Sequence, residues 1–317
     1  MIEVLNALTE ILDKNEASKF KDFLNRYNDI KSWYLMSDYC LEDTQKYNDV
    51  FSFTLLLNID EIKNLKDYIK LHAPTDLKKT KNITEGIIEF INSSAVYHFS
   101  IIIPRSEKLL SGLCDKARFT ALLTWMTDIV ENSKTVHPQR SDFFNDMLKR
   151  LKLIKTEMLK TSFNEKLMRK IFISGFLGAQ IIRMLRKHSD PTHIAWISDR
   201  DAIVDTYDGF AFDNMYFWYE ILAINEKFPF SDLQIYYIEP EKVGKNFYDE
   251  LIRIPDFIAG TLASIDCTST VNFDDLQDKH KIILHQAFTN SANQATIRIQ
   301  RTDSHLSAYN FKWIAKK

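Results

Sequence analysis

The chain has 317 residues, of which 45% are hydrophobic and 26% are charged, and its formal net charge is −2. This is an ordinary globular composition for one large domain or two smaller ones, and it excludes a strongly basic chain that coats nucleic acid. The charge is nevertheless uneven, since residues 140–188 hold twelve Lys and Arg against four acids, and residues 189–278 hold eighteen acids against five bases.

The cysteine pattern and the N-terminus bear on the compartment. Cys40, Cys114 and Cys267 are far apart and show no metal-binding spacing, which predicts a reduced, cytoplasmic protein. The N-terminus lacks the basic and apolar parts of a signal peptide, and no window approaches ~18 uninterrupted apolar residues. We therefore expect neither secretion nor a membrane span.

The first thirty residues read as a helical appendage. Apolar residues recur at helical spacing within residues 2–26, which predicts two short helices. No chemistry-bearing motif occurs in them. We interpret residues 1–30 as a segment that packs on the chain or docks a protein partner.

The next seventy-five residues predict a mixed sheet. A strand from Trp33 to Met36 ends at Ser37 and Asp38, and a second strand over residues 50–57 pairs with it in antiparallel fashion. The spacing further predicts helices at residues 60–71 and 84–91 and a third strand at residues 95–103. Strands joined by loops and helices are typical of an α/β fold.

Residues 106–188 predict a large all-helical insertion with three amphipathic helices. Basic residues lie between the apolar positions of the last two. We weigh two interpretations, a solvated face and a basic wall that contacts the phosphates of nucleic acid. The candidate nucleic-acid-binding residues are Lys149, Arg150, Lys152, Arg169, Lys170, Arg183, Arg186 and Lys187.

Strand and helix alternate again after the insertion. A short buried strand runs from His193 to Ser198 and is followed by Asp199 and Asp201. An aromatic helix at residues 210–225 comes next, and we assign its Trp and Tyr side chains to the core.

The remaining elements of the core are one strand and one long helix. A strand is expected at residues 233–238 and an amphipathic helix at residues 248–265, with Asp256 early in that helix. Residues 267–317 are polar and predict a less ordered closing segment, with a helical patch at 282–288 and a possible strand at 295–300.

Acidic residues stand at the ends of separate elements. Asp38 follows the first strand, Asp199 and Asp201 follow the fourth, and Asp256 lies near the start of the last core helix. Taken singly, each has a structural explanation, as a strand end or as a first-turn acid favoured by the helix dipole. Taken together, they predict a site for Mg²⁺ or Mn²⁺, because hard cations prefer carboxylate oxygens.

Three segments carry a resemblance to a known family. Residues 254–260 read Ile-Pro-Asp-Phe-Ile-Ala-Gly, residues 197–201 read Ile-Ser-Asp-Arg-Asp, and residues 35–40 read Leu-Met-Ser-Asp-Tyr-Cys. These segments resemble the ribonuclease H-like family catalogued as domain of unknown function 3800, whose members open with a strand running into Asp-Glu-Ser-Gly and close with a helix of the form Ala-Asp-Leu-Ile-Ala-Gly. The first segment keeps the Asp of the family motif and lacks its Glu-Ser-Gly.

The resemblance implies a ribonuclease H-like core made of residues 31–105 and 189–266, in which acids from a first central strand, a later strand and a helix converge on divalent cations. It implies that Asp38, Asp199 and Asp256 are the catalytic metal ligands, and we add Asp201 as a reserve ligand. The expected activity is metal-dependent hydrolysis of phosphodiester bonds in nucleic acid.

A second hypothesis assigns the chain no catalysis. In this alternative the fold is kept without an active site, and the chain binds a protein partner through its N-terminal helices or its helical insertion, for instance as a subunit of a bacterial defence or toxin-like assembly. The missing Glu-Ser-Gly after Asp38 favours it.

Overall fold

A computed structural model describes residues 2–107, 114–228, 233–241, 244, 246–267, 275–289, 292–301 and 306–311. The chain divides into two compact units. The helical unit comprises residues 110–183 and 200–228, and the sheet unit comprises residues 2–109, 184–199 and 229–317. The boundary crosses the predicted core, since Asp199 belongs to the sheet unit and Asp201 to the helical unit.

The sheet unit is built on a mixed seven-stranded sheet with the strand order β5-β4-β1-β2-β3-β6-β7. Strand β1 lies inside the sheet, with β4 parallel to it on one side and β2 antiparallel on the other. The α/β class predicted from the sequence is confirmed. The strands are β1 (Ser32–Cys40), β2 (Asn48–Leu57), β3 (Val96–Pro104), β4 (His193–Ser198), β5 (Gln234–Ile238), β6 (Gln294–Arg301) and β7 (Leu306–Asn310).

Two predictions about the strands are wrong. Strand β1 does not stop at Asp38 but continues to Cys40, because residues 37–40 stay paired with β2 up to the Cys40–Val50 pair. The described part of the closing segment holds more strand than the sequence predicted. It adds β6, confirming the possible strand at 295–300, and an unpredicted strand β7.

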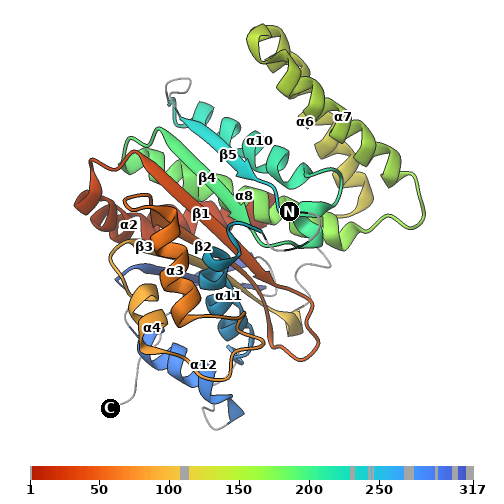
Figure 1. The fold of residues 1–317 in the computed structure, drawn as a ribbon. Helices are drawn as coiled ribbons and strands as arrows, with labels where there is room; N and C mark the ends of the chain where they lie inside the picture. Colours follow the sequence, from red (N-terminus) through yellow and green to blue (C-terminus); the bar gives the residue numbers. More distant parts are fainter. Residues whose placement is uncertain are drawn as a thin grey trace. The chain divides into compact units, whose positions relative to one another are not determined.

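One face of the sheet is covered by helices that follow the strands in sequence (Figure 1). Alternation along the strands places Met36, Val50, Ile102 and Ile197 on this face. Helix α11 packs against β1 and β2 over these residues. The covering helices are α3 (Ile62–His72), α4 (Glu85–Ile91), α11 (Asp249–Ala263) and α12 (Asp278–Ile283), which continues into a π-helical turn (Leu284–Phe288).

The opposite face of the sheet holds the N-terminal helices. They are α1 (Ile2–Ile11), a π-helical turn (Leu12–Glu16), α2 (Ala17–Leu24) and a 3₁₀ turn (Asn25–Tyr27), so the predicted pair of helices is confirmed. The Phe20 ring lies 4.8 Å from the Tyr97 ring and 5.2 Å from the Phe99 ring, measured between centroids. The apolar face of α2 is therefore part of the core of the sheet unit.

The helical unit contains the three long helices predicted from the sequence, of which α6 and α7 form an antiparallel pair (Figure 1). Asp115 caps α6, accepting a hydrogen bond of 2.8 Å from the backbone N–H of Arg118. Trp218 and Tyr219 of α10 are buried, as expected for core residues. The helices are α6 (Lys116–Val136), α7 (Ser141–Met158), α8 (Glu165–His188, which ends in the sheet unit), α9 (Ala202–Asp205) and α10 (Phe210–Asn225).

A helix that crosses a bilayer must be both long and apolar. Among the described helices, none combines the length and the apolar character needed to cross a membrane.

Candidate active site

Asp38 and Asp199 lie at neighbouring positions on two parallel strands. The last pair in the register of β1 and β4 is Ser37 with Ser198, and the next residue along each strand is an aspartate. The backbone N–H of Asp199 donates a hydrogen bond of 3.1 Å to the carbonyl of Ser37, which continues the ladder past the end of β4. Adjacent strands are about 4.8 Å apart, so the two aspartates are side by side.

Both side chains point to the sheet face that α11 covers. Successive residues of a strand point to opposite faces, and Met36 and Ile197, two residues before the aspartates, belong to the core on the α11 face. Asp38 is 9% exposed and Asp199 is half-buried. Ser52, the partner of Asp38 on β2, has a buried hydroxyl with no hydrogen-bond partner among the described residues.

Asp256 lies in the middle of α11 rather than in its first turn. The helix begins at Asp249, and Pro255 stands inside it. The explanation of Asp256 as a first-turn acid favoured by the helix dipole is therefore wrong, because that effect fades beyond the first turn. Its carboxylate Oδ2 accepts a hydrogen bond of 2.7 Å from the backbone N–H of Leu77.

Electrostatics places Asp256 near Asp199. Burial, together with the charges of Asp76 and Asp199, raises the pKa of Asp256 to about 6, although the Leu77 N–H and Lys279 act to lower it. Burial likewise raises the pKa of Cys40 to about 11, and Asp38 and Asp256 both contribute to that rise. Asp38 and Asp199 are therefore adjacent at the ends of β1 and β4, and Asp256 of α11 interacts electrostatically with Asp199.

Carboxylate oxygens are the type of donor that a hard divalent cation prefers. The carboxylates come from three elements, β1, the end of β4 and α11, and Mg²⁺ and Mn²⁺ favour such oxygen ligands. A cation would also offset the mutual repulsion that raises the pKa of Asp256. Within the described part of the chain, no three or more His, Cys, Asp or Glu side chains are already arranged to hold a metal ion.

The reserve ligand Asp201 has a structural role. Its Oδ1 accepts a hydrogen bond of 2.8 Å from the backbone N–H of Ile203, so it caps the short helix α9 in the helical unit. Asp is among the residues that most favour this capping position.

The candidate nucleic-acid-binding residues fall into two groups. Arg169 and Arg183 are buried, and Arg150 forms an ion pair of 3.0 Å with the buried Asp213. These three guanidinium groups serve the core of the helical unit. In the helical unit Lys149 and Lys152 are exposed and Lys170 is half-buried, and in the sheet unit Lys187 is exposed and Arg186 is half-buried; phosphate binding by these residues stays a prediction for each unit separately.

Two histidines, His98 and His193, lie away from these carboxylates. His98 is buried between the hydroxyl of Thr54 and the carbonyl of Ile91, each 2.9 Å away, and burial lowers its pKa to about 4. His98 is therefore a core residue of the sheet unit. His193 is exposed at the start of β4, at the end opposite to Asp199.

Two charged residues near Asp256, Asp76 and Lys279, and a third at the C-terminal end of α11, Lys46, were not predicted from the sequence. Asp76 precedes the loop that donates to Asp256, Lys279 lies in α12, and Lys46 lies in the loop between β1 and β2. Burial is the largest cause that lowers the pKa of His280 to about 4. The charges of Lys46 and Lys279 also lower it. Each is a single charged residue in a polar segment, and no motif marks it.

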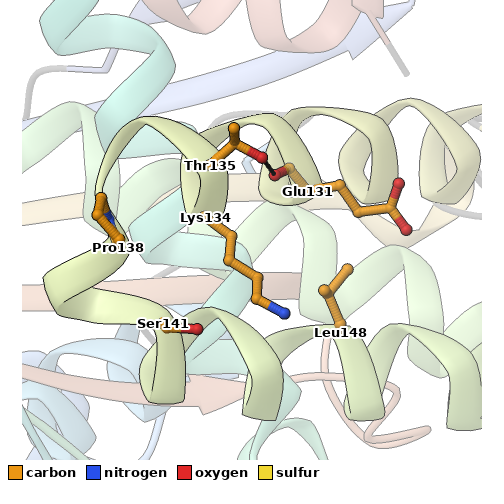
Figure 2. A pocket seen from close by; sticks show the side chains of 6 residues that line it. All are labelled: Glu131, Lys134, Thr135, Pro138, Ser141 and Leu148. Atoms are coloured by element: carbon orange, nitrogen blue, oxygen red, sulfur yellow. Dashed lines mark hydrogen bonds between the residues drawn. The ribbon is translucent and has the colours of Figure 1, made fainter.

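A pocket of about 490 Å³ lies between α6 and α7 of the helical unit. Figure 2 shows Lys134 of α6 extending toward Leu148 of α7, and the Thr135 hydroxyl donates to the carbonyl of Glu131 at 3.2 Å. The residues that line the pocket include one acidic residue, Glu131, and one basic residue, Lys134. The pocket therefore does not offer the carboxylate set of a divalent metal site.

Comparisons of the chain with protein-family models, with curated proteins and with solved structures find no match.

Proposed function

We propose that this chain is a nuclease with a ribonuclease H-like core, which uses Mg²⁺ or Mn²⁺ to hydrolyse phosphodiester bonds in nucleic acid. The observation that carries the proposal is the convergence of Asp38, Asp199 and Asp256 on one face of the sheet. The positions of these acids agree with the plan expected from the family resemblance. Asp38 is on the interior strand β1, Asp199 follows the later parallel strand β4, and Asp256 is on a helix that packs against β1.

The three carboxylates would hold the metal, which supplies stabilisation of the charge that develops on the phosphoryl oxygens and activation of water. Asp38 and Asp199 are fixed by neighbouring strands, so their separation depends on the backbone rather than on flexible side chains. Asp256 is held by the Leu77 N–H, and one oxygen of its carboxylate remains for a ligand. With a pKa of about 6, Asp256 is ionised above neutral pH, and activity should fall as it becomes protonated below about pH 6.

The decisive experiment measures cleavage of single-stranded and double-stranded DNA and RNA with Mn²⁺ and with Mg²⁺. The variants are Asp38→Asn, Asp199→Asn and Asp256→Asn, with Asp190→Asn as the matched control. Asp190 precedes β4 at the end of the strand opposite to Asp199, and it forms an exposed ion pair with Lys31. We expect wild-type activity in the control and a loss of at least about a hundredfold in the other three. Full activity in Asp199→Asn or Asp256→Asn would refute the proposal.

The non-catalytic alternative is favoured by one observation on the helical unit. Trp125 and Leu153 are each 40% exposed, Val136 is 60% exposed and Leu159 is 83% exposed, all on α6, α7 or the residue after α7. Such exposed apolar side chains suit a protein partner. In contrast, the apolar face of the N-terminal helix α2 packs on its own sheet, which removes it as a docking surface. An absence of any metal-dependent change in the melting temperature would favour this alternative.

A further inference from the structure

Two lysines from distant segments of the chain form hydrogen bonds near α11. Lys46, in the loop after β1, donates a hydrogen bond of 2.5 Å from Nζ to the hydroxyl of Ser264, at the C-terminal end of α11. Lys279 of α12 donates from Nζ to the carbonyls of Leu77 at 2.8 Å and Thr80 at 3.3 Å. Both ammonium groups are therefore held in place by fixed partners.

Lys279 is connected to the carboxylate site by a shared contact, and Lys46 is connected to the segment that carries Lys279. Leu77 links Lys279 to the carboxylate site directly, since its carbonyl accepts from Lys279 and its N–H donates to Asp256. Ser264 contacts both Lys46 and the Nε2 of His280, 3.3 Å away, and His280 follows Lys279 in the chain. Burial and the charge of Lys46 lower the pKa of Lys279, whereas Asp256 raises it.

We propose that Lys46 and Lys279 form a phosphate subsite beside Asp256, which binds a backbone phosphate of the nucleic acid next to the bond that is cut. This inference rests on the proposed function and assigns it two positioning residues. An ammonium group has three donors, and the hydrogen bonds to Ser264, Leu77 and Thr80 use one donor of Lys46 and two of Lys279. The remaining donors are available to phosphate oxygens, and an anion between two like charges relieves their repulsion.

The chemistry of the subsite limits what it recognises. Lysine offers a point charge rather than the planar fork of arginine, so it binds phosphate without reading bases. We therefore expect binding without sequence preference. Both a phosphodiester backbone and free inorganic phosphate carry the group that the subsite binds, and the two sources are distinguished by competition.

The test measures binding without cleavage, so that its result does not depend on catalysis. A fluorescently labelled single-stranded oligonucleotide without terminal phosphates is titrated with the full chain in EDTA, at several salt concentrations. The Lys46→Gln/Lys279→Gln variant is compared with Lys63→Gln/Lys81→Gln, which removes the same charge from two exposed lysines of the sheet unit.

We expect the Lys46→Gln/Lys279→Gln variant to bind at least about tenfold more weakly than the control. The slope of log affinity against log salt should fall by about 0.7 for each phosphate of the single strand that the variant no longer neutralises. Equal affinity and slope in the two variants, or no binding by the wild-type chain, would overturn the subsite.

Two further measurements separate a binding role from a structural one and identify the source of the phosphate. Lys46→Arg/Lys279→Arg keeps both charges and should restore most of the affinity, and failure to restore it would overturn the subsite. Inorganic phosphate should compete with the oligonucleotide for the wild-type chain only weakly, even at high concentration. Weak competition would indicate that the subsite prefers the phosphate of a nucleic-acid backbone to free phosphate. Competition that is equally strong on Lys46→Gln/Lys279→Gln would contradict the proposal.

The two proposals fail in different ways. If the wild-type chain cleaves no nucleic acid with Mn²⁺ but shows the lysine-dependent binding in EDTA, the subsite stands and the nuclease activity does not. If it cleaves nucleic acid and the lysine variants bind like their control, the subsite is wrong and the nuclease stands.

Discussion

Asp256 accepts a hydrogen bond of 2.7 Å from the backbone N–H of Leu77, yet burial and the nearby carboxylates still raise its pKa to about 6. The charged form of this side chain is therefore destabilised by the fold. Its retention at a buried position, against a cost in stability, is the behaviour expected of a functional group.

Replacing Asp256 by Asn should stabilise the chain while it abolishes activity. A carboxyl group whose pKa is higher in the folded state than in the unfolded state contributes stability at pH values below its unfolded pKa. For Asp256 this contribution is lost as the pH rises from about 4, the unfolded pKa, to about 6, the folded pKa. Asn is uncharged and keeps an oxygen for the Leu77 N–H. At pH 8 and without metal, we expect the free energy of unfolding of Asp256→Asn to exceed that of the wild type by about 1–3 kcal/mol. Denaturant unfolding at pH 8 and pH 4 measures the difference, which should shrink at pH 4.

Divalent metal should raise the melting temperature of the wild-type chain, since a ligand that binds only the folded state stabilises it by about 2.7 kcal/mol at a hundred times its Kd. The increase should be lost in Asp38→Asn and Asp199→Asn and retained in Asp190→Asn. Thermal unfolding with and without millimolar Mn²⁺ provides the measurement. Equal shifts in all four proteins would place the metal elsewhere.

Acid should destabilise the sheet unit through His98. Its pKa is lowered by burial to about 4, so the folded state holds the ring neutral while the unfolded chain takes up a proton below pH 6.5. Stability is then lost as pH falls from about 6.5 to about 4, by up to roughly 3 kcal/mol in total. The His98→Gln variant should show a flatter stability profile over this range than the wild type, although it will be less stable at neutral pH. A profile as steep as that of the wild type would assign the loss to other groups, of which His280 is the first candidate.

Disrupting the apolar face of helix α2 should destabilise the sheet unit, because this face packs on the sheet rather than on a protein partner. Phe20 is fully buried against Tyr97 and Phe99, and Phe20→Ala should lower the free energy of unfolding by about 3–5 kcal/mol. Lys21→Ala, at the next position on α2 and exposed, should change it by less than about 0.5 kcal/mol. Similar unfolding curves for the two variants would mean that α2 is not part of this core.

Substitutions of basic residues in the helical unit should differ in their effect on stability, depending on whether the side chain is buried or exposed. Arg183 is 2% exposed and forms an ion pair with Glu226, so Arg183→Gln leaves a partly buried carboxylate without this cation and should cost about 3 kcal/mol. Lys152→Gln, on the exposed face of α7, should leave stability unchanged within about 0.5 kcal/mol. Chemical denaturation of both variants tests this contrast. Equal stability would indicate that Arg183 is not needed for the fold.

The amino-acid sequence by itself determined the local elements. The strand His193–Ser198 and the helix Phe210–Asn225 were predicted with the bounds that the structure shows, and the three long helices of the insertion were also found. Their signals are the spacing of apolar residues over a few turns or pleats, which depends only on neighbours in the chain. The acids at the ends of these elements were visible for the same reason.

Only the tertiary structure decided which of these side chains meet. Asp38 and Asp199 become neighbours through the parallel pairing of β1 with β4, which lie more than 150 residues apart in the chain. Asp256 joins them because α11 packs on β1, and Lys46 and Lys279 come from loops and helices that carry no motif. The burial of Arg169 and Arg183 was equally hidden, because an amphipathic pattern does not show which charges pair inside a core. Long-range pairing is fixed by packing and desolvation over the whole fold, and a local pattern contains neither.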